Sequence, residues 1–142
     1  MDKAKQLVKD HHLEDKVIFK GYIVPSELWN YTKDATIGIT LFDKVGASNY
    51  YSLANRFFDY IQAGIPQLCV DYPVYREING QYSVALLVDD LSPENLAASL
   101  NNLLANDVLY QELQENCFRA RTIYNWQNEE KYLLEFYQQI LN

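Results

Sequence analysis

The chain has 142 residues, of which 49% are hydrophobic, and its 12 Lys and Arg against 19 Asp and Glu give a formal net charge of -7. This length suits one domain with a sizeable core. The negative charge and the lack of a basic run argue against nucleic-acid binding, which relies on clustered Lys and Arg. No apolar run approaches the roughly 20 residues that span a bilayer, and no export signal is visible.

The N-terminal quarter predicts a helix followed by a strand, a helix and a second strand. Apolar residues at helical spacing predict the first helix over residues 2–12. The run 17–19 is typical of a short buried strand, and a Pro-led helix follows over about 25–33. Residues 35–41 are apolar enough for a strand covered on both faces, as in parallel sheets.

The potential metal ligands are few and scattered. His11 and His12 are adjacent and are the only histidines, so on a helix they point in different directions. Cys69 and Cys117 lack any CxxC or His spacing and occur in apolar patterns, which favours buried, reduced thiols. We therefore expect no metal site, and a cytoplasmic location.

Residues 42–51 are predicted to form a loop after the strand 35–41. Small polar residues, Ser48 and Asn49 among them, would let this loop lie close to a bound molecule. Open α/β sheets bind ligands at such carboxyl ends of strands. The competing interpretation is a flexible surface connection.

A helix over residues 53–63 is bounded by clear signals. Ser52 is suited to the N-cap because its hydroxyl can accept a free N–H of the first turn. Gly64 followed by Pro66 is a normal helix exit. The sequence therefore predicts a helix placed between the loop and a new strand.

Two stripes divide this helix. Phe57 and Ile61 recur at i, i+4 and predict a face packed on the core. Asn55, Asp59 and Gln62 recur at i, i+4, i+7 and predict a polar face. The helix is expected to be anchored on one side and to present polar groups on another.

The rest of the chain continues the alternation of strands and helices. Its predicted elements are strand 67–70, a turn or short helix over 73–80, strand 84–88, helix 92–105, helix 107–124 and a last helix capped by Asn125. The apolar stripe of the last helix is expected to close the domain's own core. Arg76 and Glu77 are expected to form an exposed pair on the short helix 73–80. The whole pattern predicts an α/β fold, with a Rossmann-like parallel sheet of about four strands flanked by helices.

A family resemblance rests on residues 52–66. Ser52-Leu53-Ala54-Asn55-Arg56-Phe57-Phe58-Asp59-Tyr60, followed by Ala63-Gly64-Ile65-Pro66, resembles the S-x-P-x-K-x-x-(D/E)-Y-x-x-x-G-x-P signature. This signature belongs to the C-terminal, donor-binding domain of GT-B glycosyltransferases, close to glycosyltransferase family 4. Residues 17–21, 31–39 and 124–126 also occur in the family's order. The resemblance implies one partial nucleotide-sugar-binding domain over residues 1–142, with C-terminal helices over 92–142. It also offers a second interpretation of the last helix, which in the family crosses toward the other domain.

The resemblance also implies roles for individual residues. In the family, the acidic residue five places before the Gly holds the ribose of a nucleotide-sugar, and this role falls on Asp59. The helix start, with Ser52, Asn55 and Arg56, would face the donor diphosphate, where the helix dipole favours an anion. The flanking donor-loop candidates are Ser48, Asn49 and Tyr51, and the second-rank candidates are Arg76 and Glu77. No catalytic residue is assigned, and no metal or cofactor is expected.

The sequence departs from the family pattern at three positions. Tyr51 stands where the family has a second acid that contacts the transferred sugar. Ala54 replaces a frequent Pro. Arg56 replaces a frequent Lys, which keeps the charge but changes its geometry. These departures leave the identity of the sugar open.

The resemblance implies a fragment of a longer enzyme. The family's donor domain begins with two further strands and follows an acceptor-binding domain, and neither precedes residue 1. We therefore expect the isolated chain to lack transferase activity, and we expect self-association through exposed sheet edges. A peripheral location at the inner membrane face would come from the missing domain.

Two other classes of protein remain open. A different nucleotide binder should show G-x-G-x-x-G or G-x4-G-K-(S/T), and neither motif occurs. A non-catalytic interaction domain that retains the fold is the second alternative. Tyr51 in place of an acid favours it, because a fold alone does not establish activity.

Overall fold

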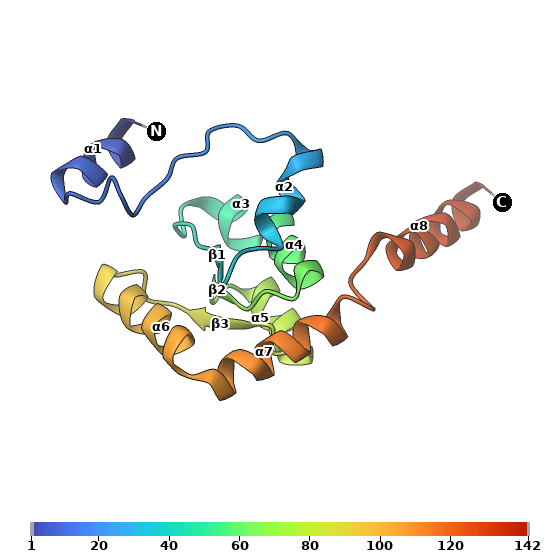
Figure 1. The fold of residues 1–142 in the computed structure, drawn as a ribbon. Helices are drawn as coiled ribbons and strands as arrows, with labels where there is room; N and C mark the ends of the chain where they lie inside the picture. The colour runs from blue at the N-terminus through green and yellow to red at the C-terminus, as the bar shows by residue number, and fades with distance from the viewer. Residues whose placement is uncertain (1, 142) are drawn as a thin grey trace.

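The computed structural model describes residues 2–141 and contains one parallel sheet. Its strands are β1 (Gly38–Thr40), β2 (Gln67–Val70) and β3 (Ala85–Val88), in the order β1-β2-β3. Helices flank this sheet (Figure 1). The predicted α/β fold with a parallel sheet is therefore confirmed, although the described residues hold three strands rather than about four.

Eight helices surround or extend from the sheet within residues 2–141. They are α1 (Asp2–Asp10), α2 (Pro25–Thr32), α3 (Gly46–Tyr51), α4 (Asn55–Ala63), α5 (Pro73–Gln81), α6 (Pro93–Ala105), α7 (Asp107–Ala120) and α8 (Trp126–Leu141). None of them is both long and apolar enough to cross a membrane. In Figure 1, α1 and α8 extend away from the sheet on opposite sides.

The core is built around the central strand β2, whose four residues are all buried. One apolar cluster joins Phe57 of α4 and Tyr75 of α5 to β2. The other joins Leu68 of β2 to Leu103 of α6 and Leu113 of α7. Because β2 carries buried side chains on both faces, helices must cover both sides of the sheet.

A buried amide connects β1, β2 and α4. Thr40 donates its hydroxyl to Oε1 of Gln67 at 2.9 Å, and Gln67 donates Nε2 to the Phe57 carbonyl at 3.1 Å. Both Thr40 and Gln67 are fully buried. A buried amide is stable only when it is hydrogen-bonded, so this residue fixes how α4 sits on the sheet.

The end of α4 is set by Gly64, as predicted. Gly64 adopts φ 72°, and its N–H donates to the carbonyls of Ile61 and Tyr60. A Cβ at this position would also collide with the ring of Phe118. Glycine is therefore required here both by the left-handed backbone and by the close approach of α7.

The predicted strand 17–19 is wrong. Within residues 2–141 this segment belongs to no strand, and its side chains are 38%, 71% and 42% exposed at Val17, Ile18 and Phe19. A parallel strand needs a hydrogen-bonded neighbour, and β1 pairs only with β2 in the described sheet. Apolar composition without such a partner does not form a strand.

The predicted start of the central helix is also wrong. Residues 46–51 of the expected loop form α3, and α4 begins at Asn55 with Ala54 at the N-cap position. Ser52 does not cap α4; its hydroxyl donates to the Asn49 carbonyl at 3.3 Å. The Ala54 N–H instead donates to the Tyr75 hydroxyl at 2.8 Å, a partner from α5 that no local pattern could reveal.

The last helix does not close the core, contrary to expectation. Its N-cap is confirmed, because the Asn128 N–H donates to Oδ1 of Asn125 at 3.0 Å. However, none of the described residues of α8 is buried, and Trp126, Leu133 and Tyr137 are exposed. Leucines of α6 and α7 pack in one core cluster, and residues of α4 and α5 pack in the other. The core around the sheet is therefore covered without α8.

The buried Gln67 amide yields a double-variant prediction. Thr40→Val leaves Oε1 of Gln67 buried without a donor, and we expect a loss of about 1–3 kcal/mol in the free energy of unfolding. Gln67→Leu should cost a similar amount. The double variant should cost less than the sum, because the two residues share one bond. Urea unfolding measures all three.

A matched control is Thr32→Val on the surface helix α2. The Thr32 hydroxyl donates to the Leu28 carbonyl at 3.2 Å, in an exposed setting. It should change the free energy of unfolding by less than about 0.5 kcal/mol. Strict additivity of Thr40→Val and Gln67→Leu would contradict the proposed role of the buried bond.

Candidate functional site

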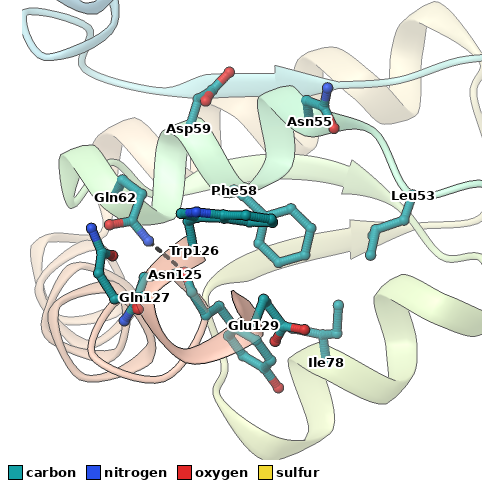
Figure 2. A pocket seen from close by; sticks show the side chains of 11 residues that line it. Leu53, Asn55, Phe58, Asp59, Gln62, Ile78, Asn125, Trp126, Gln127 and Glu129 are labelled. Carbon is teal, nitrogen blue, oxygen red and sulfur yellow. Dashed lines mark hydrogen bonds between the residues drawn. The ribbon is translucent and has the colours of Figure 1, made fainter. Parts of the chain in front are cut away.

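A pocket lies along α4, between α5 and the start of α8 (Figure 2). Its volume is about 870 Å³. The lining combines aromatic, amide and carboxylate side chains. The residues are Leu53, Asn55, Phe58, Asp59, Gln62, Ile78, Tyr124, Asn125, Trp126, Gln127 and Glu129.

The predicted polar face of α4 forms one wall of this pocket. Asn55, Asp59 and Gln62 all line it. Phe57 and Ile61, on the other side of the helix, are fully buried in the core. The division of α4 into an anchored face and a polar face is therefore confirmed, because 3.6 residues per turn separates the two stripes.

The opposite wall is held in place through Tyr124. Gln62 donates Nε2 to the Tyr124 carbonyl at 2.6 Å, and the Tyr124 hydroxyl donates to Oε1 of Gln81 at 2.8 Å. The Tyr124 ring also lies between Phe58 and Tyr82, with centroid separations of 6.0 and 5.9 Å. These contacts fix the point from which α8 departs.

Sequence reasoning missed the contribution of α8 to the pocket. Trp126, Gln127 and Glu129 line it, although none was a candidate. The available signal was the Asn125 cap, which places the following residues in the first turn of a helix. That signal cannot show which element the first turn faces, since the contact spans more than sixty residues of sequence.

Asp59 is the only predicted ribose ligand, and its environment is unusual for a carboxylate. Burial raises the pKa of Asp59 above its ordinary value of 3.8. No Lys, Arg or His lines the pocket in the part of the chain that the structure describes. The protein therefore keeps a half-buried acid without a compensating cation, a cost that is common at binding sites.

The carboxyl ends of the strands form a separate region filled by aromatic rings. Phe42 after β1 and Tyr72 after β2 make an edge contact at 5.7 Å, and Tyr72 donates its hydroxyl to the Phe42 carbonyl at 2.7 Å. Tyr50 of α3 packs on Tyr72 at 5.1 Å, with Lys44 over its ring. The edge where a ligand was expected is thus partly occupied by the protein's own side chains.

Arg56 does not line the pocket. Burial raises the pKa of Cys69 in β2 to about 12, and the backbone of Val70 and the charge of Arg56 act in the opposite direction. Arg56 also opposes the rise that burial causes in the pKa of Tyr75. The charge of Arg56 therefore acts on groups of β2 and α5.

The remaining candidates do not meet in one place. Asn49 donates Nδ2 to the Asp43 carbonyl at 3.1 Å, and Ser48 lies on the same short helix α3. Tyr51 of α3 is exposed and packs on Tyr50. Of the predicted site residues, the pocket therefore brings together only Asn55 and Asp59.

Arg76 and Glu77 are both exposed on the short helix α5, as expected, but Arg76 pairs with Asp71 rather than with Glu77. Nε and Nη2 of Arg76 donate to the two carboxylate oxygens of Asp71, each at 2.8 Å. This two-point geometry is the preferred arrangement of guanidinium and carboxylate. Glu77 acts on Tyr124 instead. Burial raises the pKa of Tyr124, and the charges of Tyr82 and Glu77 raise it further.

Comparison with known proteins identifies the family. A family profile described as glycosyl transferases group 1 matches residues 1–120. The chain belongs to the glycosyl transferases group 1 family. A search of curated proteins gave no significant match.

A solved structure supports the fold. The chain is similar to sucrose-phosphate synthase from Thermosynechococcus elongatus, with a TM-score of 0.81 and 20% identity. The match covers 99% of this chain and 34% of the synthase chain. The group 1 chain thus corresponds in fold to about a third of that GT-B glycosyltransferase.

The raised pKa of Asp59 predicts a pH-dependent effect on stability. A raised carboxyl pKa means that folding disfavours the charged form, so the cost is absent below the pKa of the unfolded chain and complete above the folded-state pKa. We expect Asp59→Asn to increase the free energy of unfolding at about pH 7 and to leave it unchanged near about pH 3. Urea unfolding at both pH values tests this.

Glu112→Gln is the control for that experiment, because Glu112 is an exposed carboxylate on α7. It should show no comparable dependence on pH. A loss of stability in Asp59→Asn at neutral pH would show that the folded protein stabilises the charged carboxylate, contrary to the effect of burial.

Proposed function

We propose that this chain is the donor-binding part of a glycosyltransferase that transfers a sugar from a nucleotide-sugar to an acceptor, in polysaccharide or glycoconjugate synthesis. Membership of the group 1 family and the GT-B fold support the general activity. The observation that carries the donor role is Asp59, a half-buried carboxylate that lines the pocket. A carboxylate can accept hydrogen bonds from both hydroxyls of a ribose.

The diphosphate is proposed to lie at the first turn of α4. The N–H groups and the dipole of a helix start favour an anion, and Arg56 adds a full positive charge. Residues three apart on a helix are neighbours on its surface, so one ligand crossing this turn can reach both Arg56 and Asp59. Ser52 and Asn55 flank the same turn. No metal ion is part of this proposal.

A second candidate is a non-catalytic interaction domain. Tyr51 replaces the expected second acid, and its exposed ring packs on Tyr50 rather than on a pocket. The apolar side chains of α8 are also exposed. This candidate predicts no saturable binding of any nucleotide-sugar, so the two proposals separate in one titration.

Calorimetric titration with UDP-, GDP- and ADP-sugars tests the donor site. One nucleotide should bind saturably, and Asp59→Ala should weaken it by about 10- to 100-fold, as expected for hydrogen bonds to a charged group. Arg56→Ala should also weaken binding, and more strongly at low ionic strength. Glu112→Ala and Arg119→Ala on α7 remove matched exposed charges and should leave the affinity unchanged. Absence of saturable binding would favour the interaction domain.

The isolated chain should bind a donor without turning it over. It covers 34% of the length of the synthase it resembles, and a transfer reaction also needs a bound acceptor positioned for attack. We expect no acceptor-dependent release of nucleoside diphosphate in a coupled assay with the nucleotide-sugar that binds. Release that rises with added acceptor would contradict this expectation.

A further inference from the structure

The two outer strands of the sheet differ in how their free edges are protected. In the described sheet, β1 and β3 each pair only with β2, so each has one edge without a neighbouring strand. Such an edge presents unpaired N–H and C=O groups, which are a template for another strand. A side chain closes the edge of β3, whereas the edge of β1 is open.

Asn79 of α5 closes the outer edge of β3. The Val88 carbonyl accepts from the Asp71 N–H at 2.8 Å, on the side of β2. Successive residues of a strand direct their backbone groups to opposite edges, so Ala85 faces outward. Oδ1 of Asn79 accepts the Ala85 N–H at 2.9 Å, and Nδ2 donates to the Ala85 carbonyl at 3.2 Å. A further strand would have to displace this amide.

The outer edge of β1 has no such protection. The Gly38 N–H donates to the Pro66 carbonyl at 2.9 Å, on the side of β2. The next residue, Ile39, therefore directs its N–H and C=O outward. Apart from the ladder with β2, no group within residues 2–141 forms a hydrogen bond with the backbone of Ile39. This edge is open to a strand from outside the fold.

The N-terminal arm, residues 2–24, carries a segment that lacks a strand partner. The backbone groups of Ile18 and Phe19 have no hydrogen-bond partner among the described residues. Both side chains are exposed. β-Branched and aromatic residues favour strands where a neighbouring strand is present. The segment 17–19 therefore has the composition of a strand and the unpaired groups of one.

Little ties this arm to the rest of the molecule. No described residue of the arm is buried. Its hydrogen bonds stay within the arm or join Val24 to the first turn of α2, and Lys20 lies over the Tyr31 ring at 5.4 Å. Figure 1 shows the chain between α1 and α2 running outside the sheet and its covering helices. The arm can therefore change its path at low cost.

The open edge and the unpaired segment complement each other, but they do not meet within one molecule. Two copies can satisfy both, because each copy gives one arm and accepts one, which closes the assembly at a dimer. Residues 20–24 belong to no helix or strand, so they can carry the segment onto a neighbouring molecule. Meanwhile α2 keeps its place against α4.

We propose that the arm of a second copy adds residues 17–19 as a strand to the outer edge of β1, which forms an arm-exchanged homodimer. The outward groups of Ile39 then gain partners in the arm, and the apolar side chains of the arm are covered. The self-association expected from the sequence thus falls on the edge of β1. No residue of the proposed donor site lies in the arm or in β1, so the dimer is tested separately from donor binding.

Sedimentation velocity on the 142-residue chain tests the dimer. We expect a monomer–dimer equilibrium between about 5 µM and about 500 µM protein. Ile18→Lys places a charge in the added strand and should weaken the dimer about 10-fold or more. Ile18 is 71% exposed, so the variant should fold normally. Val108→Lys, at a 77% exposed position of α7, is the matched control and should leave the equilibrium unchanged.

Amide hydrogen exchange followed by NMR identifies the edge. The Ile39 N–H is unpaired in one molecule and paired in the proposed dimer. Its exchange should therefore slow about 10-fold or more as the protein concentration rises through the dimer range. The Leu68 N–H, in the buried strand β2, should be protected at every concentration.

Each outcome decides the proposal. Dimerisation that Ile18→Lys weakens, with protection of Ile39 that depends on concentration, supports it. A chain that stays monomeric, or a dimer that Ile18→Lys does not weaken, overturns it. A dimer without protection of Ile39 also overturns it, because the contact then lies elsewhere, as on the exposed side of α8. Protection of Ile39 at every concentration would show that the molecule's own arm closes the edge, which excludes the exchange.

Discussion

The buried side chain of Gln67 is the constraint on which the site depends. Its amide joins Thr40 of β1 to the backbone of α4 from within the central strand. Desolvation makes this arrangement sensitive to geometry, because an amide that loses either partner remains buried and unsatisfied. The core stripe of α4 supplies most of the apolar contact, whereas the amide fixes the helix's rotation and height. The direction in which Asp59 leaves α4 follows from that placement.

Local patterns predicted the fold where the deciding contacts are local or periodic. The two faces of α4 follow from its helical period, and the Gly64 exit follows from a left-handed residue. The prediction failed where a distant partner decides. The Tyr75 hydroxyl accepts the Ala54 N–H at the start of α4, where a cap by Ser52 was expected. The segment 17–19 has no strand beside it in the described sheet. One sequence read locally contains no information about those partners.

The candidate site could be predicted only in part, for the same reason. Asp59 and Asn55 share a face of α4, and the helical period places them together. Arg56 follows Asn55 directly, so a rotation of about 100° directs it to another face. Directly after β2, Asp71 forms a salt bridge with Arg76, so this candidate arginine already has a partner within the protein. Arg56 is thus absent from the pocket lining although it is next to Asn55 in the sequence and three residues from Asp59.

The two walls of the pocket differ in how firmly they are held. The α4 wall is anchored through Phe57 and Ile61, which are fully buried. The α8 wall has no buried residue among those described and depends on the contacts of Tyr124 with Gln62 and Gln81. Regions with few buried contacts open at lower free energy than the core. Any change in the direction of α8 must therefore move Trp126 and Glu129 while Asp59 stays in place, so the shape of the pocket is coupled to whatever α8 contacts.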